Sequence, residues 1–124
     1  MKVRMAVGAA VIALGVSTQT MAVSDGNSLI VECTDTVRAL NGQQPNSSIG
    51  AASCLGLVTG VMDTLTIVND SMPRKEQICF PPQGIQYGQG VRIVLQYLTT
   101  HPAHLQKRGV LLAVVALQDA FPCQ

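Results

Sequence analysis

Four cysteines, at positions 33, 54, 79 and 123, constrain the fold of this chain more than any other feature. They lie in a stretch of about one hundred residues, where a hydrophobic core is modest and covalent cross-links add needed stability. An even number of cysteines in a small exported chain is typical of a disulfide framework, which predicts two bonds. No C-x-x-C pair is present, and the wide spacings do not resemble a zinc ribbon, so we expect no zinc site.

The N-terminus indicates export. The chain begins MKVR, continues with an uncharged and mostly apolar run over residues 6–16, and then has polar and small residues up to Ala22. This is the three-part layout of a secretory signal peptide. The apolar run is about half the ~20 residues that a membrane-spanning helix needs. We therefore expect residues 1–22 to be removed, leaving residues 23–124 as a single helical domain with no membrane association.

Apolar residues recur with helical periodicity over most of the remaining chain, and strand-like alternation is absent. The pattern predicts four helices, over about residues 27–40, 48–70, 86–99 and 102–120. Pro102 suits the first position of the fourth helix. The centre of that helix, residues 110–117, is apolar all round, which predicts burial on most sides. The expected fold class is all-α, a small bundle of about four helices in two antiparallel hairpins.

Hairpin geometry favours one pairing of the cysteines. Cys79 comes just before the third helix and Cys123 just after the fourth, so an antiparallel pair brings them together. Cys33 and Cys54 lie at similar distances from the turn between the first two helices, on the apolar side of each. The sequence allows three connectivities. The pairs Cys33–Cys54 and Cys79–Cys123 satisfy both hairpins.

Two glycines, Gly56 and Gly60, lie within the second helix. Each costs about 1 kcal/mol relative to alanine in a helix interior. Such a cost suggests that the backbone of another segment packs closely against the helix at these two glycines. We expect tight helix packing at these positions in preference to a ligand-binding notch.

No catalytic pattern stands out. The chain has no G-x-S-x-G, no H-E-x-x-H and no glycine-rich phosphate loop, and its cysteines are expected to be oxidised. The two histidines, His101 and His104, come from one segment and do not make a metal site. We expect His101 to cap the fourth helix and His104 to be exposed. The chain is interpreted as a binding module that is not an enzyme and that carries no cofactor and no metal.

The charge of the chain argues against nucleic acid as a partner. Without Lys2 and Arg4, six basic and seven acidic residues remain, a net charge of −1. The basic residues are scattered and the chain has no Trp. A nucleic-acid-binding surface would show a basic patch with aromatic residues. We therefore do not expect nucleic acid as a partner.

Three segments together resemble the Rap/Tai family of small periplasmic immunity proteins of type VI secretion systems. They are CLGLVTGVMDTL, CFPPQGIQYGQGVRIVLQYLTTHP and ALQDAFPC. Their matching positions include cysteines, glycines, prolines and aromatic residues: Cys54, Gly56, Gly60, Cys79, Gly84, Gln89, Tyr97, Leu98, His101, Pro102, Ala116, Leu117, Phe121, Pro122 and Cys123. Two features depart from the pattern and predict a change at the start of the third helix. The prolines after Cys79 are shifted by one residue, and Gly90 stands where an apolar residue is expected.

The resemblance implies a function. A protein of this kind is periplasmic and binds a peptidoglycan-cleaving amidase delivered by neighbouring bacteria, a cysteine–histidine enzyme, whose groove it occludes. Such proteins often act as dimers, so the resemblance also implies a homodimer. The matching residues look like framework and do not say which effector is bound.

Because the matching motif residues look like framework, we look for the residues that contact a partner in another part of the chain. The segment over residues 69–77, NDSMPRKEQ, is irregular and polar and ends beside Cys79. Binding residues concentrate on loops that a rigid scaffold positions. The alternative of a plain solvated connector stays open. The residues that we predict to contact a partner are Asp70, Met72, Pro73, Arg74, Lys75 and Gln77.

Two other functions fit the same sequence. One is a periplasmic helical chaperone or stress-response protein that holds unfolded clients at acid pH. The other is a structural subunit of an envelope complex. Two disulfides argue against the easy opening that a chaperone of this kind needs. Selectivity separates these functions, because an immunity protein binds one enzyme tightly and a chaperone binds many clients weakly.

Overall fold

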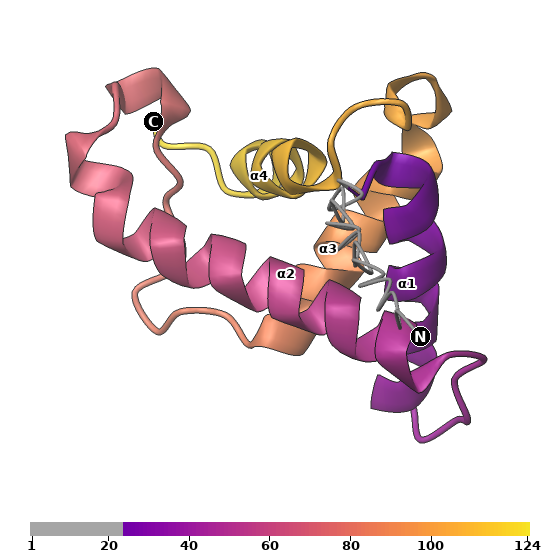
Figure 1. Cartoon of the computed structure of the whole chain (residues 1–124). Helices are drawn as coiled ribbons and strands as arrows, with labels where there is room; N and C mark the ends of the chain where they lie inside the picture. The colour runs from indigo at the N-terminus through magenta and orange to yellow at the C-terminus, as the bar shows by residue number, and fades with distance from the viewer. Residues whose placement is uncertain (1–23) are drawn as a thin grey trace, which may run out of the picture.

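The computed structural model describes residues 24–124, so the expected signal peptide, residues 1–22, lies outside the described residues. Four α-helices and three short 3-10 turns make up the described chain, and none of it forms a strand (Figure 1). The prediction of an all-α bundle is confirmed. The elements in chain order are α1 (Gly26–Leu40), α2 (Ser48–Val68), η1 (Asn69–Ser71), η2 (Arg74–Glu76), α3 (Tyr87–Thr100), η3 (Pro102–His104) and α4 (Gly109–Ala120).

Helix α1 begins and ends on local signals. The Asp25 side chain accepts a hydrogen bond of 2.9 Å from the Ser28 backbone N–H, so it caps the helix. That bond, with help from the Asn27 side chain, lowers the pKa of the Asp25 carboxyl below its usual value. At the other end, Gly42 takes a positive φ of 75°, the left-handed conformation that ends many helices.

Helices α1 and α2 are joined inside the core. The Cys33–Cys54 disulfide connects them, as predicted, and both cysteines are fully buried. The buried Thr36 hydroxyl donates a hydrogen bond of 2.7 Å to the Ala51 carbonyl across the same contact. Polar and covalent links therefore lie among the apolar side chains of the first hairpin.

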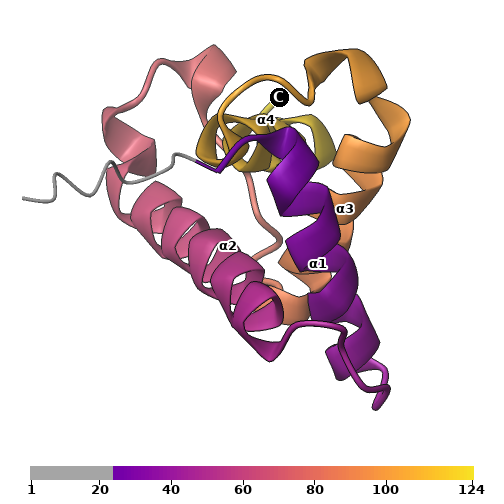
Figure 2. The same ribbon diagram turned by 45° about the vertical axis from the view of Figure 1, so that its right-hand side comes forward.

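The four helices share one hydrophobic core. Helix α1 lies beside α3, and α2 runs across the molecule as the longest helix (Figures 1 and 2). The largest fully buried side chains come from all four helices: Leu29, Cys33, Cys54, Val58, Val91, Val94, Leu98, Leu112 and Leu117. The short connections keep these elements adjacent.

Gly90 explains how closely α2 and α3 approach. It is buried, and a Cβ placed there would lie 2.4 Å from the Met62 Sδ atom and 3.3 Å from the Val58 Cγ1 atom. An apolar side chain, which the family pattern led us to expect, would therefore not fit unless the Met62 and Val58 side chains moved. The glycine is a packing adaptation within α3.

The fourth helix begins later than predicted. Pro102 starts the short turn η3, and α4 itself begins at Gly109. The intervening segment forms backbone hydrogen bonds with the start of α1. The Gly26 N–H bonds to the Lys107 carbonyl at 3.1 Å, and the Gly109 N–H bonds to the Ser24 carbonyl at 2.7 Å. These long-range bonds take the place of a continuous helix, and sequence periodicity does not report them.

Burial of α4 is also narrower than predicted. One side of the helix is buried through Leu112, Ala113, Ala116 and Leu117. Val110 and Leu111 are about half exposed. The all-round apolar composition therefore leaves an apolar face of α4 uncovered in this chain.

Helix α2 is unusually apolar. With η1 it forms a segment, Ser48–Ser71, that is long and apolar enough to cross a membrane by length and composition alone. Length and composition do not distinguish a membrane span from a core helix. Here one side of α2 supplies Cys54, Val58 and Leu65 to the core.

Candidate partner-binding site

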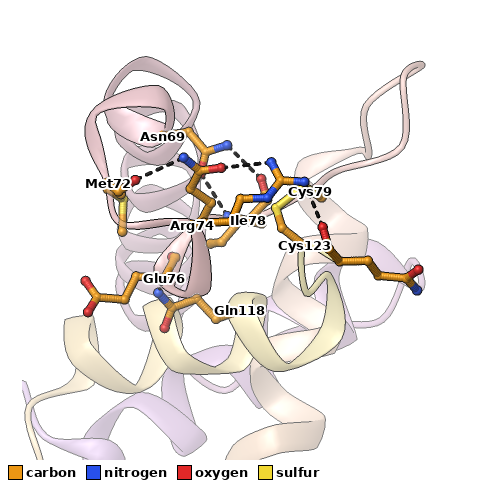
Figure 3. The surroundings of a disulfide bond; sticks show 10 residues. Asn69, Met72, Arg74, Glu76, Ile78, Cys79, Gln118 and Cys123 are labelled. Atoms are coloured by element: carbon orange, nitrogen blue, oxygen red, sulfur yellow. Dashed lines mark hydrogen bonds between the residues drawn. A yellow bond between two sulfur atoms is a disulfide. The ribbon is translucent and has the colours of Figure 1, made fainter.

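The second disulfide, Cys79–Cys123, forms as predicted and lies at the surface. It joins the segment after α2 to the C-terminal tail, which we call together the loop–tail unit, residues 69–79 and 121–124 (Figure 3). Backbone pairing extends the link, because the Cys79 N–H donates to the Phe121 carbonyl at 2.9 Å. The Phe80 and Phe121 rings meet edge to face, with centroids 5.2 Å apart. The terminal cysteine therefore fixes both the tail and the loop beside it.

An asparagine closes the loop at its start. The Asn69 side-chain amide donates to the Ile78 carbonyl at 2.9 Å, and its oxygen accepts from the Ile78 N–H at 2.8 Å (Figure 3). The side chain thus imitates a paired backbone strand. Residues 70–77 are held as a closed loop, whose two 3-10 turns replace the irregular coil that the sequence suggested.

Polar side chains hold the loop in shape through hydrogen bonds. Gln77 donates from Nε2 to the Met72 carbonyl at 2.9 Å. Arg74 donates to the Gln77 Oε1 atom at 3.2 Å and to the Gln124 carbonyl at 2.9 Å (Figure 3). The Gln118 side chain of α4 donates to the Glu76 carbonyl at 2.6 Å. The loop is therefore shaped before any partner binds.

The structure divides the predicted contact residues into two groups. Met72 and Gln77 are half-buried, and Met72 packs against the core. Arg74 is exposed, but its guanidinium already has two partners inside the unit. The side chains that remain on the exterior are Asp70, Pro73 and Lys75. All six stay predicted contacts.

A hollow of about 300 Å³ lies beside the loop. It is formed where the end of α2 meets the segment that enters the disulfide. Its lining residues are Leu65, Thr66, Asn69, Asp70, Ile78, Cys79 and Phe80. The loop–tail unit therefore has a concavity beside it at the surface.

The glycines of α2 were misjudged from the sequence. A Cβ placed on Gly56 or Gly60 would meet nothing within 4 Å, so no described backbone packs tightly against either position. Both instead line an open groove of about 440 Å³ between α2 and α4. The other lining residues are Leu57, Val61, Thr64, Leu65, Val110 and Val114. The groove is apolar, and none of its lining side chains is charged.

The two histidines have roles that differ from those predicted. His101 bonds through Nδ1 to the Tyr97 carbonyl at 2.9 Å, so it binds the end of α3 and does not cap α4. Its ring stacks on Tyr97, with centroids 4.0 Å apart. His104 is half-buried, not exposed, and its Nδ1 atom lies 3.1 Å from the Tyr97 hydroxyl. The described residues contain no group of three or more side chains suited to a metal.

One exposed pair links α2 and α3. The Tyr87 hydroxyl donates to the Asp63 carboxylate at 2.8 Å. This hydrogen bond and the negative charge of Asp63 both raise the pKa of Tyr87. The pair is solvent-exposed and holds the start of α3 against α2.

Comparison with known families identifies the family of the chain. The family model of Rap1a immunity proteins matches residues 25–123, which include all four helices and both disulfides. The chain belongs to the Rap1a immunity protein family. No curated protein and no solved structure matches the chain. The resemblance drawn from the sequence is therefore confirmed at the level of the family.

Proposed function

We propose that this protein is a periplasmic immunity protein that binds and occludes a peptidoglycan amidase delivered by a type VI secretion system. Membership of the immunity family supports the role. The signal-like N-terminus and the disulfides are typical of an exported protein. The producing cell would keep its wall intact because the enzyme's groove is filled. The protein acts by binding, with no chemistry of its own.

The loop–tail unit is the proposed contact surface. The single observation that carries this assignment is its pre-organisation: Asn69, Arg74 and the Cys79–Cys123 bond fix a polar loop at the surface. A loop that is already shaped loses less conformational entropy on binding, which favours tight inhibition. Lys75 supplies the unengaged positive charge of the six predicted contacts.

The first experiment uses the oxidised mature protein, residues 23–124, tagged at its N-terminus, to capture partners from envelope and secreted extracts of the source organism and its kin. We expect one stoichiometric peptidoglycan amidase whose hydrolysis of cell-wall fragments is lost in the complex. Capture of many unrelated envelope proteins, with protection of clients from acid aggregation, would instead support the chaperone. Recovery of a stable multi-subunit envelope assembly would support a structural role.

A matched pair of lysine variants tests the contact surface. Lys75→Glu reverses charge on the loop, and Lys107→Glu makes the same change between η3 and α4. Both lysines are exposed. We expect Lys75→Glu to weaken inhibition about tenfold or more, as for a charged contact at an interface, and Lys107→Glu to leave it unchanged. Equal inhibition by both variants would remove the loop from the contact surface.

The α2/α4 groove supports the homodimer that the family resemblance implies. Its uncharged lining combines Gly56 and Gly60, which leave open space, with the half-exposed Val110 side chain of α4. An isologous interface needs such self-complementary features on one patch. We expect sedimentation to detect a dimer that Val110→Glu dissociates. Leu40→Glu, at an equally exposed apolar position at the end of α1, should leave the dimer intact. A monomeric parent protein would exclude this interface.

A further inference from the structure

A second groove lies at the other end of α2 from the loop–tail unit, between α1 and the first turns of α2. Its volume is about 490 Å³. The lining residues combine carboxylates, serine hydroxyls and aliphatic side chains: Ser28, Val31, Glu32, Asp35, Ser47, Ile49, Gly50 and Ser53. No basic residue is among them.

The two carboxylates of this groove differ in their hydrogen bonding. Asp35 is buried, and its oxygens accept from the backbone N–H groups of Asn46 and Ser47 at 2.9 and 3.0 Å. Its role is therefore to fix the turn before α2. Glu32 is half-buried, and its Oε2 atom is closed to solvent without a hydrogen-bond partner among the described residues. A carboxylate oxygen in that position has lost water and gained no donor, which is unfavourable.

Two exposed aliphatic side chains line the same groove as Glu32. Val31 is 64% exposed and Ile49 is 84% exposed. Contiguous exposed apolar side chains around a polar group are typical of a surface that a partner covers. An anionic partner is disfavoured, because the groove offers two carboxylates and no positive side chain.

We propose that this groove binds a protein segment that presents an arginine or lysine between apolar side chains. The cationic group supplies the donor that Glu32 lacks, after a small rotation of the carboxylate. The flanking apolar side chains pack on Val31 and Ile49. Because Asp35 already holds the surrounding turn, the groove changes little on binding. This surface is additional to the loop–tail unit, and the inference does not require that the partner be an amidase.

The test uses a peptide, so it is independent of any effector. Isotope-labelled protein is titrated with acetyl-Leu-Arg-Leu-amide and, as the neutral control, with the same peptide carrying citrulline in place of arginine. We expect NMR shift changes around Glu32 and Ile49, with the citrulline peptide about tenfold weaker, as for a lost charge-assisted hydrogen bond. Added salt should weaken only the arginine peptide.

Two matched pairs of variants locate the binding. Glu32→Gln should bind the arginine peptide about tenfold more weakly, whereas Asp119→Asn, an exposed carboxylate on α4, should bind like the parent protein. Ile49→Ser should weaken binding, whereas Ile67→Ser, 82% exposed near the other end of α2, should not. Shift changes elsewhere, no changes, or equal affinity for both peptides would overturn the proposal. Failure here leaves the amidase test unaffected, and the reverse also holds.

Discussion

The two disulfides occupy opposite physical environments. Cys33–Cys54 joins two helices inside the core, and both of its residues are 0% exposed. Cys79–Cys123 joins a loop to a tail at the surface, where Cys79 is exposed. Packing around the first bond would hold its helices together to a large extent even without the sulfurs. The second bond holds segments whose other links are hydrogen bonds and one aromatic contact near the surface. The buried bridge therefore reinforces the core, and the surface bridge fixes the shape of an exposed loop.

Removal of the buried bridge is expected to have the largest effect. Loop-closure entropy for a separation of 21 residues corresponds to about 3 kcal/mol, and the gap left in the core adds to it. The double variant Cys33→Ala and Cys54→Ala should therefore lose about 4 kcal/mol or more of unfolding free energy. Urea denaturation measures the loss.

Removal of the surface disulfide, Cys79–Cys123, is expected to cost less stability than removal of the buried one. Its separation of 44 residues makes the entropy term larger, about 4 kcal/mol, so chain entropy alone ranks it first. We expect the double variant Cys79→Ala and Cys123→Ala to lose only about 2 kcal/mol of unfolding free energy, because the tail and loop fray locally while the core persists. If this variant were less stable than the core variant, chain entropy and not packing would set the ranking.

Chemical reduction distinguishes the same two bonds without mutation. Thiol–disulfide exchange requires access to a sulfur atom. Limiting reductant should therefore open Cys79–Cys123 before Cys33–Cys54, and the singly reduced protein should keep its helical circular dichroism. It should also lose inhibition of its partner if the loop–tail unit is the contact surface. Mass spectrometry after alkylation identifies which cysteines react first. Simultaneous reduction of the two disulfides would contradict the expected order.

Two glycines differ in packing as the two disulfides differ in burial, so alanine substitutions at them should have opposite effects on stability. Gly90→Ala should cost about 1 kcal/mol, because overpacking against Val58 and Met62 exceeds the gain in helix propensity. Gly60→Ala faces open space and should stabilise the monomer by up to about 1 kcal/mol. Thermal unfolding at low protein concentration compares the two. A loss of stability in both variants would mean that the groove beside Gly60 is closed in solution, and a gain in both would mean that α3 is not tightly packed at Gly90.

The smallest expected effect concerns the helix cap at Asp25, a link that is neither covalent nor buried. Its folded-state pKa is lowered, so its stabilising contribution is complete above the unfolded value of 3.8 and is lost as the pH falls through the folded pKa. Asp25→Ala should be less stable than the parent near neutral pH, and the difference should shrink below pH 3.8. Denaturation midpoints of both proteins across this range measure it, and a difference that stays constant would rule out the cap as its cause.

Local patterns predicted much of this molecule. Apolar periodicity placed α1, α2 and α3 to within a residue or two, and hairpin logic found both cysteine pairs. These features depend on near neighbours in the chain. The loop over residues 69–77 was also found as a distinct segment, because prolines and polar residues interrupt the helical pattern there.

Long-range contacts account for the errors. The glycines of α2 were expected to touch another backbone, but α4 crosses so that a groove remains beside them. Arg74 stays a predicted partner contact, but the sequence did not reveal that the tail brings the Gln124 carbonyl within 2.9 Å of its guanidinium. Both outcomes depend on segments that are far apart in the sequence.

The sequence by itself determined the helical class, the two disulfides and the family, because periodicity, cysteine spacing and motif order are properties of the chain alone. Only the tertiary structure decided where α4 begins, which apolar faces stay uncovered and which polar side chains are already engaged. Those outcomes follow from hydrogen bonds and packing between distant segments, such as the pairing of Gly26 with Lys107. No local pattern in the sequence encodes them.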